Sequence, residues 1–397
     1  MTERGESHFR WTANIAHPQL SFHQRLISEI VVEVDGKELE TRRKDGELVS
    51  FFQITDGEGT RYQGHSAIQL GKLAENVKAA TVQSEQRAFF LPGDYQLAVV
   101  LLDTATREHT ATQMKFRVSA PSPGILAEAW RNLPSVEFIT DKESPDRWYL
   151  PDIQGRLQWA ATAAAPVHMN VILNVAPSVP VYGARHTPSE GLPALLPTLK
   201  VISEAGSAAV SEHIELLDLA RRRAVFQNDV QAPEHELEWA SLKASLAESN
   251  TASIDLHSLS DRHHDAQFFV SEVRRVLRVP DKDSDKPGVL VILSTPVAFE
   301  SGEDLDPISL ESLPACRVFY IRYHAAPQRA ANPYPQMGGR GRGMRPGAGP
   351  MGRRPGEINV VDQLEATLKP LKPKLFDVET PEEITKALSE IQKRLGK

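Results

Sequence analysis

The sequence predicts two folded domains: an all-β sandwich, and after it an α/β domain whose sheet is doubly wound and mostly parallel. Three observations support this fold class. At 397 residues the chain is too long for one ordinary hydrophobic core. Short alternating runs separated by turn residues fill its first 120 residues. From Val167 onward, apolar runs alternate with amphipathic ones, which is typical of α/β architecture.

The predicted N-terminal domain covers residues 1–120. Residues 27–34 are rich in β-branched side chains and precede Asp35-Gly36, a strong turn signal. The clearest hairpin joins residues 96–102 to residues 111–118 through the polar tetrapeptide 103–106. Further strands are expected at residues 48–54, 67–70 and 77–82, the last being the weakest because residues 73–80 also fit a helix.

The start of that hairpin carries a family resemblance. Leu91-Pro92-Gly93-Asp94-Tyr95 resembles the entry to the penultimate strand of bacterial immunoglobulin-like and fibronectin-like domains, where Leu-Pro-Gly-x-Tyr-x-Leu is common. The resemblance implies an immunoglobulin-like β-sandwich and almost nothing about function. Residues 121–160 should form an ordered linker, because four aromatic side chains in it favour packing: Trp130, Phe138, Trp148 and Tyr149.

The predicted C-terminal domain covers residues 161–397. Thr380 is expected to cap the final helix, whose first turn is Pro381-Glu382-Glu383. The other elements follow from apolar runs and helical spacing. Strands are expected at residues 167–173, 200–204, 212–218, 224–227, 289–293, 317–323 and 374–378, and helices at residues 188–196, 234–248, 265–277, 360–371 and 381–395.

This order of elements resembles the von Willebrand factor A domain over roughly residues 165–397. Gln363-Leu364-Glu365, Phe376-Asp377-Val378 and Pro381-Glu382-Glu383-Ile384 resemble that family's closing helix, strand and helix. The whole chain resembles bacterial proteins, many from acidobacteria, that join an A-like domain to an immunoglobulin-like one. The resemblance implies a binding function centred on a metal-ion-dependent adhesion site, which uses Asp-x-Ser-x-Ser, a distant threonine and a distant aspartate.

Carried onto this chain, the adhesion-site motif is degenerate. Its positions fall on Asn174, Ala176, Ser178, Thr251 and Thr295, so both carboxylates are missing. Neutral oxygens alone do not offset the desolvation of a divalent cation, so we expect no metal and no cofactor. The alternative is that Glu300, Glu303 or Asp304 supplies the negative charge that the two missing carboxylates would have given a metal site.

A second group of potential metal ligands is the densest in the chain: His257, Asp261, His263, His264 and Asp265. On a helix, Asp261 and Asp265 would share a face with His264, which would suit zinc or another transition metal. We favour a polar helix entry instead, with Asp261 as N-cap, because no second ligand set has a recognisable spacing. No nucleophile elbow, zincin motif or P-loop is present, which favours a protein that is not an enzyme.

Residues 327–356 form a basic island of Gly, Pro, Met and Arg without an acidic residue, and include Arg340, Arg342, Arg345, Arg353 and Arg354. This composition cannot bury enough apolar surface to fold alone, so a disordered insertion is expected. It could contact an acidic protein surface or polymer, or bind RNA. The hydrolase alternative would need a cleft with perturbed acids.

Composition narrows the function classes further. A net charge of −7 argues against general nucleic-acid binding, and the single cysteine, Cys316, excludes an internal disulfide. No stretch reaches the roughly 18 apolar residues that span a bilayer. The sequence leaves the cellular compartment undecided. The protein is expected to be extracytoplasmic if a signal peptide precedes this sequence, and cytoplasmic otherwise. The sequence therefore predicts non-catalytic binding of another protein through Asn174, Ser178, Thr251 and Thr295, or through Arg340, Arg342 and Arg345.

Overall fold

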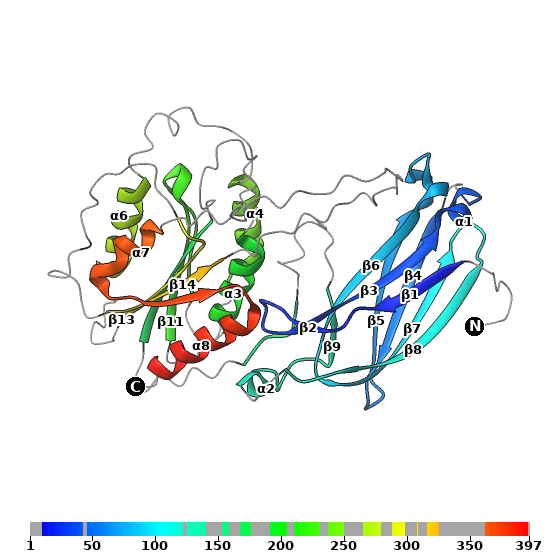
Figure 1. The fold of residues 1–397 in the computed structure, drawn as a ribbon, viewed down its shortest axis with the longest axis horizontal. Coiled ribbons are helices and arrows are strands. Elements are labelled where there is room, and N and C mark those ends of the chain that lie inside the picture. The colour runs from blue at the N-terminus through cyan, green and yellow to red at the C-terminus, as the bar shows by residue number, and fades with distance from the viewer. Residues whose placement is uncertain are drawn as a thin grey trace, which may run out of the picture.

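The structure is a computed structural model of the full chain (Figure 1). It describes residues 10–42, 46–121, 125–139, 153–158, 167–175, 191–204, 210–230, 237–249, 265–278, 288–297, 308, 316–324 and 362–395. These residues build three sheets, two from the N-terminal half and one from the C-terminal half.

Both N-terminal sheets are antiparallel. The first has the order β1-β3-β6-β9, with β2 paired to the start of β3. The second has the order β5-β4-β7-β8. The strands of the first are β1 (Trp11–Ile15), β2 (Gln19–Leu20), β3 (Leu26–Asp35), β6 (Thr81–Phe90) and β9 (Val136–Phe138); those of the second are β4 (Glu47–Thr55), β5 (Arg61–Gln69), β7 (Gly93–Asp103) and β8 (His109–Val118).

Alternation along the strands decides which side chains enter the core between these sheets. In β7, Tyr95, Leu97, Val99 and Leu101 are buried, while the residues between them are more exposed. Such a period of two places one face of each strand against the partner sheet. The hydroxyls of Ser66 on β5 and Ser84 on β6 lie 2.6 Å apart and join the two layers.

The C-terminal half contains a six-stranded sheet of order β12-β11-β10-β13-β14-β15. All neighbours in it pair in parallel except β11 and β12, which are antiparallel. A single 3₁₀ turn, Leu219–Arg221, joins β11 to β12, and so short a connection cannot carry a crossover. The strands are β10 (Val167–Asn174), β11 (Val210–Asp218), β12 (Arg223–Val230), β13 (Gly288–Ser294), β14 (Cys316–Tyr323) and β15 (Lys374–Val378).

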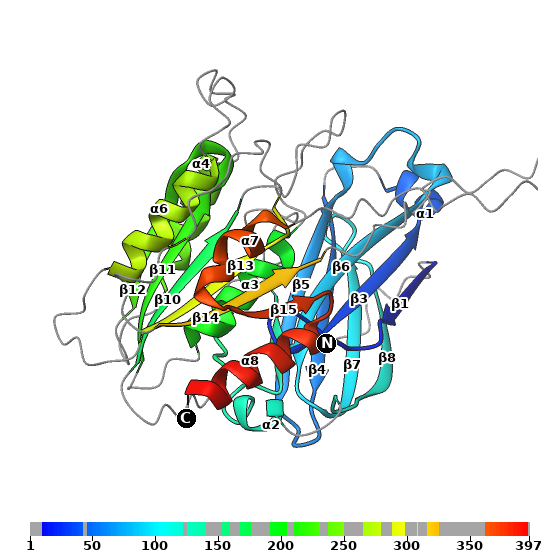
Figure 2. The same ribbon diagram turned by 60° about the vertical axis from the view of Figure 1, so that its left-hand side comes forward.

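Helices cover both faces of this sheet (Figure 2). One hydrophobic cluster includes buried residues of α3 (Leu192–Glu204), α4 (Trp239–Ser249) and α8 (Pro381–Leu395). The other includes residues of α6 (Asp265–Arg278) and α7 (Gln363–Leu368). Val171 and Ile172 are neighbours on β10 but belong to different clusters, as expected for a strand buried on both sides.

The first of these clusters continues into the N-terminal half. The turn between β2 and β3 reaches the C-terminal half, where the Phe22 and Tyr323 rings meet edge to face with centroids 5.4 Å apart. Helix α2 (Ile125–Ala129) precedes Trp130, whose indole donates to Gln24 O at 2.8 Å. Phe138, on β9, and Trp130 are thus packed, whereas Trp148 and Tyr149 lie outside the described residues.

The structure corrects the predicted fold class. Strands make up 46% of the structure and helices 30%, so it is mostly β. The prediction of a sandwich followed by a doubly wound parallel domain was therefore wrong. Two of its three sheets are antiparallel, and the third is mixed because β12 runs against β11. The immunoglobulin-like assignment gains no support beyond the antiparallel pairing itself.

Two local predictions were also wrong. Residues 200–204, expected as a strand, form the last turn of α3, because Leu192, Leu195, Leu199 and Ile202 recur at helical spacing along one buried face. Asp35-Gly36 does not form a hairpin turn. Instead, the Asp35 carboxylate accepts a hydrogen bond from the Lys37 amide at 2.9 Å and caps the short helix α1 (Gly36–Glu40). None of the described helices has both the length and the apolar character that crossing a membrane requires.

Candidate binding face at the carboxyl edge of the six-stranded sheet

Parallel strands end at one edge of a sheet, so β10, β13, β14 and β15 bring their last residues together. Asn174 ends β10 and Ser294 ends β13, and both side chains are buried. The Asn174 amide donates to Ser294 Oγ at 3.0 Å, and Ser294 Oγ donates to the carbonyl of Thr295 at 2.6 Å. Asn174, the first position of the predicted site, therefore belongs to a neutral hydrogen-bonded pair.

The start of α3 also lies at this edge. A Cβ placed on Gly191, just before α3, would come within 2.5 Å of Thr295 Cγ2. Only glycine therefore fits against Thr295 without displacing it.

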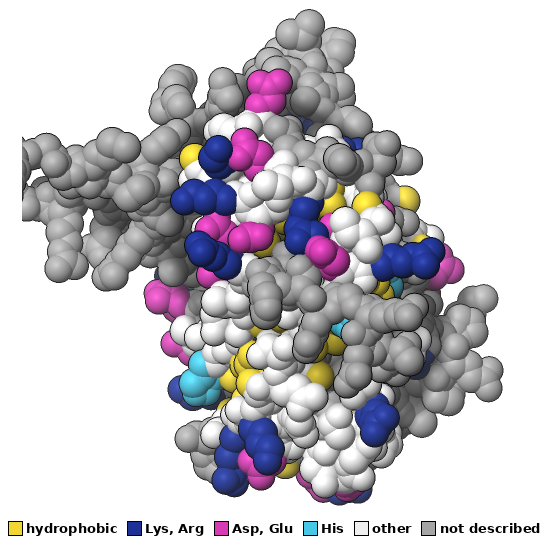
Figure 3. Space-filling model, turned by 90° about the vertical axis from the view of Figure 1, so that its right-hand side faces the viewer, with side chains coloured by type: hydrophobic (Ala, Val, Ile, Leu, Met, Phe, Trp, Pro, Cys, Tyr) yellow, Lys and Arg dark blue, Asp and Glu magenta, His cyan; other side chains and the backbone are white. Residues whose placement is uncertain are grey.

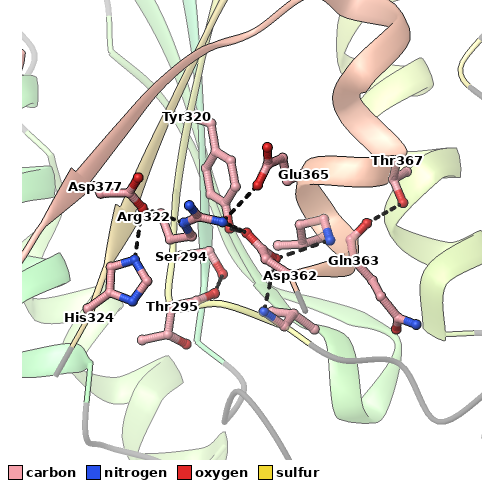
Figure 4. Close-up of polar contacts among 12 residues, drawn as sticks. Ser294, Thr295, Tyr320, Arg322, His324, Asp362, Gln363, Glu365, Thr367 and Asp377 are labelled. Carbon is pink, nitrogen blue, oxygen red and sulfur yellow. Dashed lines mark hydrogen bonds and ion pairs between the residues drawn. The ribbon is translucent and has the colours of Figure 1, made fainter. Parts of the chain in front are cut away.

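Arg322, near the end of β14, lies at the centre of an ionic network (Figure 4). Its Nε contacts Asp377 Oδ1 on β15 at 2.6 Å. Its Nη1 contacts Asp362 at 3.1 Å and Glu365 at 2.9 Å, at the start of α7. His324 Nε2 adds a second contact to Asp377 Oδ1 at 2.8 Å. One guanidinium thus links β14, β15 and α7.

Asp362 joins the segment that follows β13 and the start of α7 to this network. Its Oδ1 accepts from the amides of Val297 at 3.1 Å and Leu364 at 3.2 Å, so it is the N-cap of α7. Its Oδ2 accepts from the buried Tyr320 hydroxyl at 2.9 Å as well as from Arg322. A single carboxylate therefore joins three segments that are far apart in sequence.

The electrostatics hold these groups in fixed protonation states. Burial lowers the pKa of Arg322, but its hydrogen bonds to Asp377 and Asp362 outweigh burial, and the pKa lies above its ordinary value. Burial raises the pKa of Asp377, but hydrogen bonds from Arg322 and His324 hold it below its ordinary value. Burial, followed by the charge of Asp362, raises the pKa of Tyr320 well above its ordinary value. At neutral pH, Tyr320 cannot act as a base.

The rim of the network is acidic. The side chains of Glu365 and Asp377 are 51% and 53% exposed, whereas Arg322 is only 14% exposed. Three carboxylates therefore surround one guanidinium, and the two most accessible of these charged groups are negative. We call Arg322, Asp362, Glu365 and Asp377 the edge network.

The structure brings together only part of the predicted site. Asn174 and Thr295 lie at the same edge, each close to Ser294. The other predicted positions lie outside the described residues: Ala176, Ser178, Thr251, Glu300, Glu303, Asp304, Arg340, Arg342 and Arg345, together with His257, Asp261, His263 and His264. Within the described ranges, no group of three or more His, Cys, Asp or Glu side chains is arranged to hold a metal ion.

Sequence reasoning missed the edge network. Its members come from three elements that only the fold brings together. One signal was available: Arg322 directly follows the apolar run Val318–Ile321 within β14, and a charge there requires a partner. No comparable signal points to Asp362, which lies just before a helix where an aspartate is an ordinary N-cap.

Comparison with protein families gives no match, and comparison with curated proteins gives none either. Among solved structures, similarity is low. A putative ApaA protein from Bordetella pertussis is 14% identical over 30% of this chain and 99% of its own, with a TM-score of 0.20. The ArnB paralog VWA2 from Sulfolobus acidocaldarius is 11% identical over 58% of this chain and 40% of its own, with a TM-score of 0.23. A family 123 glycoside hydrolase from Clostridium perfringens is 8% identical over 79% of this chain and 67% of its own, with a TM-score of 0.22. At such scores, none of these similarities supports a fold or a function for this chain.

Proposed function

We propose that this chain is a non-catalytic protein that binds another protein through the carboxyl edge of its six-stranded sheet. The observation that carries the proposal is the edge network itself. Its polar groups bond to one another, and its accessible charges are the carboxylates of Glu365 and Asp377. A rigid surface with fixed charges suits recognition, whereas catalysis would need a group free to exchange protons with a substrate.

The acidic rim indicates the chemistry of the partner. Carboxylates at an accessible rim steer a basic surface into place and contribute mainly to association rate and specificity. The partner should therefore present lysine or arginine side chains to Glu365 and Asp377. Binding should not depend on a metal, because Asn174 and Ser294 already satisfy each other.

A charge reversal tests the proposal. Glu365→Lys reverses the charge of the half-exposed rim carboxylate and does not itself change Asp362 or Asp377, the other two carboxylates that contact Arg322. We expect proteins captured by the full chain to be lost, or to bind at least about tenfold more weakly, which corresponds to about 1.4 kcal/mol. Glu75→Lys makes the same charge change at an exposed site in the N-terminal half and is the matched control.

The outcomes separate the alternatives. The proposal is supported if the full chain still captures its partner in EDTA and after deletion of residues 327–356, but loses it in Glu365→Lys. Capture that Glu365→Lys leaves unchanged overturns it, provided that circular dichroism shows both variants folded.

The composition of residues 327–356 supports a second candidate, binding of RNA or another polyanion. On the face of the molecule drawn in Figure 3, basic and acidic side chains are interspersed, so the described residues there form no basic patch. Such binding would therefore depend on the segment of residues 327–356. It predicts affinity that falls steeply with salt and disappears when this segment is deleted.

A further inference from the structure

His324 follows β14 directly and contacts the edge network at Asp377 (Figure 4). Its Nε2 lies 2.8 Å from Asp377 Oδ1, and its side chain is 37% exposed. Its backbone amide donates to the carbonyl of Val378 at 2.9 Å, which continues the pairing of β14 with β15. The ring is therefore held beside a rim carboxylate while it stays accessible to protons from the solvent.

The imidazole differs from the other charged groups of this surface, because a histidine changes its charge between pH 5 and pH 8. A ring Nε2–H can donate to Asp377 in the neutral and in the protonated form, so the second proton enters at Nδ1. Burial raises the pKa of Asp377, but hydrogen bonds from Arg322 and His324 hold it below its ordinary value, so this carboxylate stays ionised over that range. Protonation of His324 thus changes the charge of the surface and keeps the contact with Asp377.

The charged groups around His324 are mostly acidic. Three carboxylates are those of the edge network, which surround its guanidinium. A fourth belongs to Glu379, just after β15: burial, followed by the charge of Glu379, raises the pKa of Tyr323, the residue before His324. One positive and four negative charges give a formal charge of −3 when the His324 ring is neutral, and −2 when it is protonated. The groups concerned are Arg322, Asp362, Glu365, Asp377 and Glu379.

We propose that His324 makes binding at the carboxyl edge sensitive to pH: the neutral ring permits binding of the basic partner, and the protonated ring weakens it. This inference rests on the proposed function, in which basic side chains of the partner meet Glu365 and Asp377. A protonated ring places its positive charge against Asp377, 2.8 Å from Oδ1, where it competes with the partner's cation and repels it. Mild acid should therefore release the partner while the chain stays folded.

The expected effect is moderate, because this surface is exposed to water. Two unit charges about 4 Å apart in water interact by an amount that corresponds to about a fivefold change in affinity. Salt at about 0.1 M screens charges that are more than about 10 Å apart, so the effect of this nearby proton should outlast that of distant histidines. That difference separates a local control from a general change in the charge of the molecule.

The general change in charge also needs a control variant, since the chain contains 13 histidines. His213 provides the matched control, because its Nδ1 lies 2.6 Å from Asp229 in another contact between a histidine and an aspartate. This pair lies on β11 and β12, and two strands of the sheet separate β11 from β14. His213→Gln should keep the pH dependence that His324→Gln removes.

The experiment is the binding of a fluorescently labelled peptide of six arginines to the full chain, followed by anisotropy at pH 7.5 and pH 5.5 in about 0.1 M salt. We expect the wild type to bind about fivefold more weakly at pH 5.5. His324→Gln keeps a donor for Asp377 but cannot take up a proton, so its two affinities should agree within about a factor of two. His324→Lys carries its charge at both pH values and should bind at pH 7.5 as weakly as the wild type does at pH 5.5.

Proton release by the wild type is a second readout and does not depend on the folding of any variant. Because the peptide and the proton oppose each other, binding at pH 6 should release protons, measured by calorimetry in two buffers of different ionisation enthalpy. The same pH dependence in the wild type and in His324→Gln overturns the inference, and so does binding at pH 6 without proton release. Binding at pH 7.5 that Glu365→Lys leaves unchanged overturns the proposed function instead, so the two failures are distinguishable.

Discussion

Glu212, on β11, is a buried carboxyl group whose two oxygens accept no hydrogen bond from the part of the chain that the structure describes. It lies on the same face of β11 as Ile214 and Leu216, which belong to the hydrophobic cluster shared by both halves. Because nothing compensates for the loss of water, burial raises the pKa of Glu212 to about 8. The group is therefore a neutral acid at neutral pH.

This raised pKa predicts how stability depends on pH. The folded state holds the Glu212 proton more tightly than the unfolded state does. The stability that this proton contributes to the folded state is therefore fully present below the ordinary pKa of 4.5. It is lost as pH rises towards and through about 8, at up to about 1.4 kcal/mol per pH unit. Glu212→Gln removes the titration, so its free energy of unfolding should exceed that of the wild type by a margin that grows between pH 5 and pH 9.

Urea denaturation at a series of pH values measures this difference. Glu75→Gln, at an exposed site, should follow the wild type at every pH. Parallel pH profiles for Glu212→Gln and the wild type would show that Glu212 is ionised or paired in the folded protein.

At the scale of elements, α8 begins with a reciprocal cap, of which the sequence predicts the Thr380 part. The Glu383 amide donates to Thr380 Oγ1 at 3.4 Å, while the Glu383 carboxylate accepts from the Thr380 amide at 3.1 Å. This is the Thr-x-x-Glu capping box. Thr380→Ala should lower the free energy of unfolding by about 1 kcal/mol, measured by thermal or urea denaturation. Thr380→Ser keeps the hydroxyl and should stay close to the wild type; equal losses in both variants would rule out the capping role.

Elements with a strong local signal were predictable from sequence, and α8, α6, β11 and β15 lie within a few residues of their predicted bounds. Prediction failed where a local pattern fits two structures. Residues 200–204 fit a strand alone, but become helical once the leucines preceding them are included. The antiparallel direction of β12 follows from the brevity of the 3₁₀ turn before it, which an apolar pattern does not reveal.

Only the part of the candidate site that lies at the ends of parallel strands was predictable from the sequence. Asn174 and Thr295 each come at or directly after an apolar run, so their meeting at one edge follows from parallel pairing. Arg322 and Asp362 are 40 residues apart, and their contact depends on where α7 packs against β14. No local pattern encodes that packing, so the edge network required coordinates.

At the scale of the whole molecule, the Gln24 side chain adds hydrogen bonds to the apolar contacts between the two halves. Gln24 lies in the turn between β2 and β3 with a left-handed backbone, φ 56°, and is fully buried. Its amide donates to Pro381 O at 3.1 Å and accepts from Thr385 Oγ1 at 2.5 Å, both at the start of α8. Its backbone carbonyl oxygen accepts a hydrogen bond from the Trp130 indole at 2.8 Å. Gln24 thus holds α8 to the N-terminal sheets.

Removing this side chain should loosen α8 before the rest of the molecule. Gln24→Ala deletes two partly buried hydrogen bonds and should lower the free energy of unfolding by about 2 kcal/mol. Hydrogen exchange should show faster exchange of the α8 amides, with those of β7 little changed, because local opening follows the lost contacts. Gln24→Asn separates the left-handed backbone conformation of this residue from its side-chain hydrogen bonds to α8. Asparagine accepts the left-handed backbone readily, but its shorter side chain cannot make both bonds, so α8 should still exchange faster. Protection of α8 in Gln24→Asn equal to that of the wild type would assign the effect to the backbone rather than to the contact between the halves.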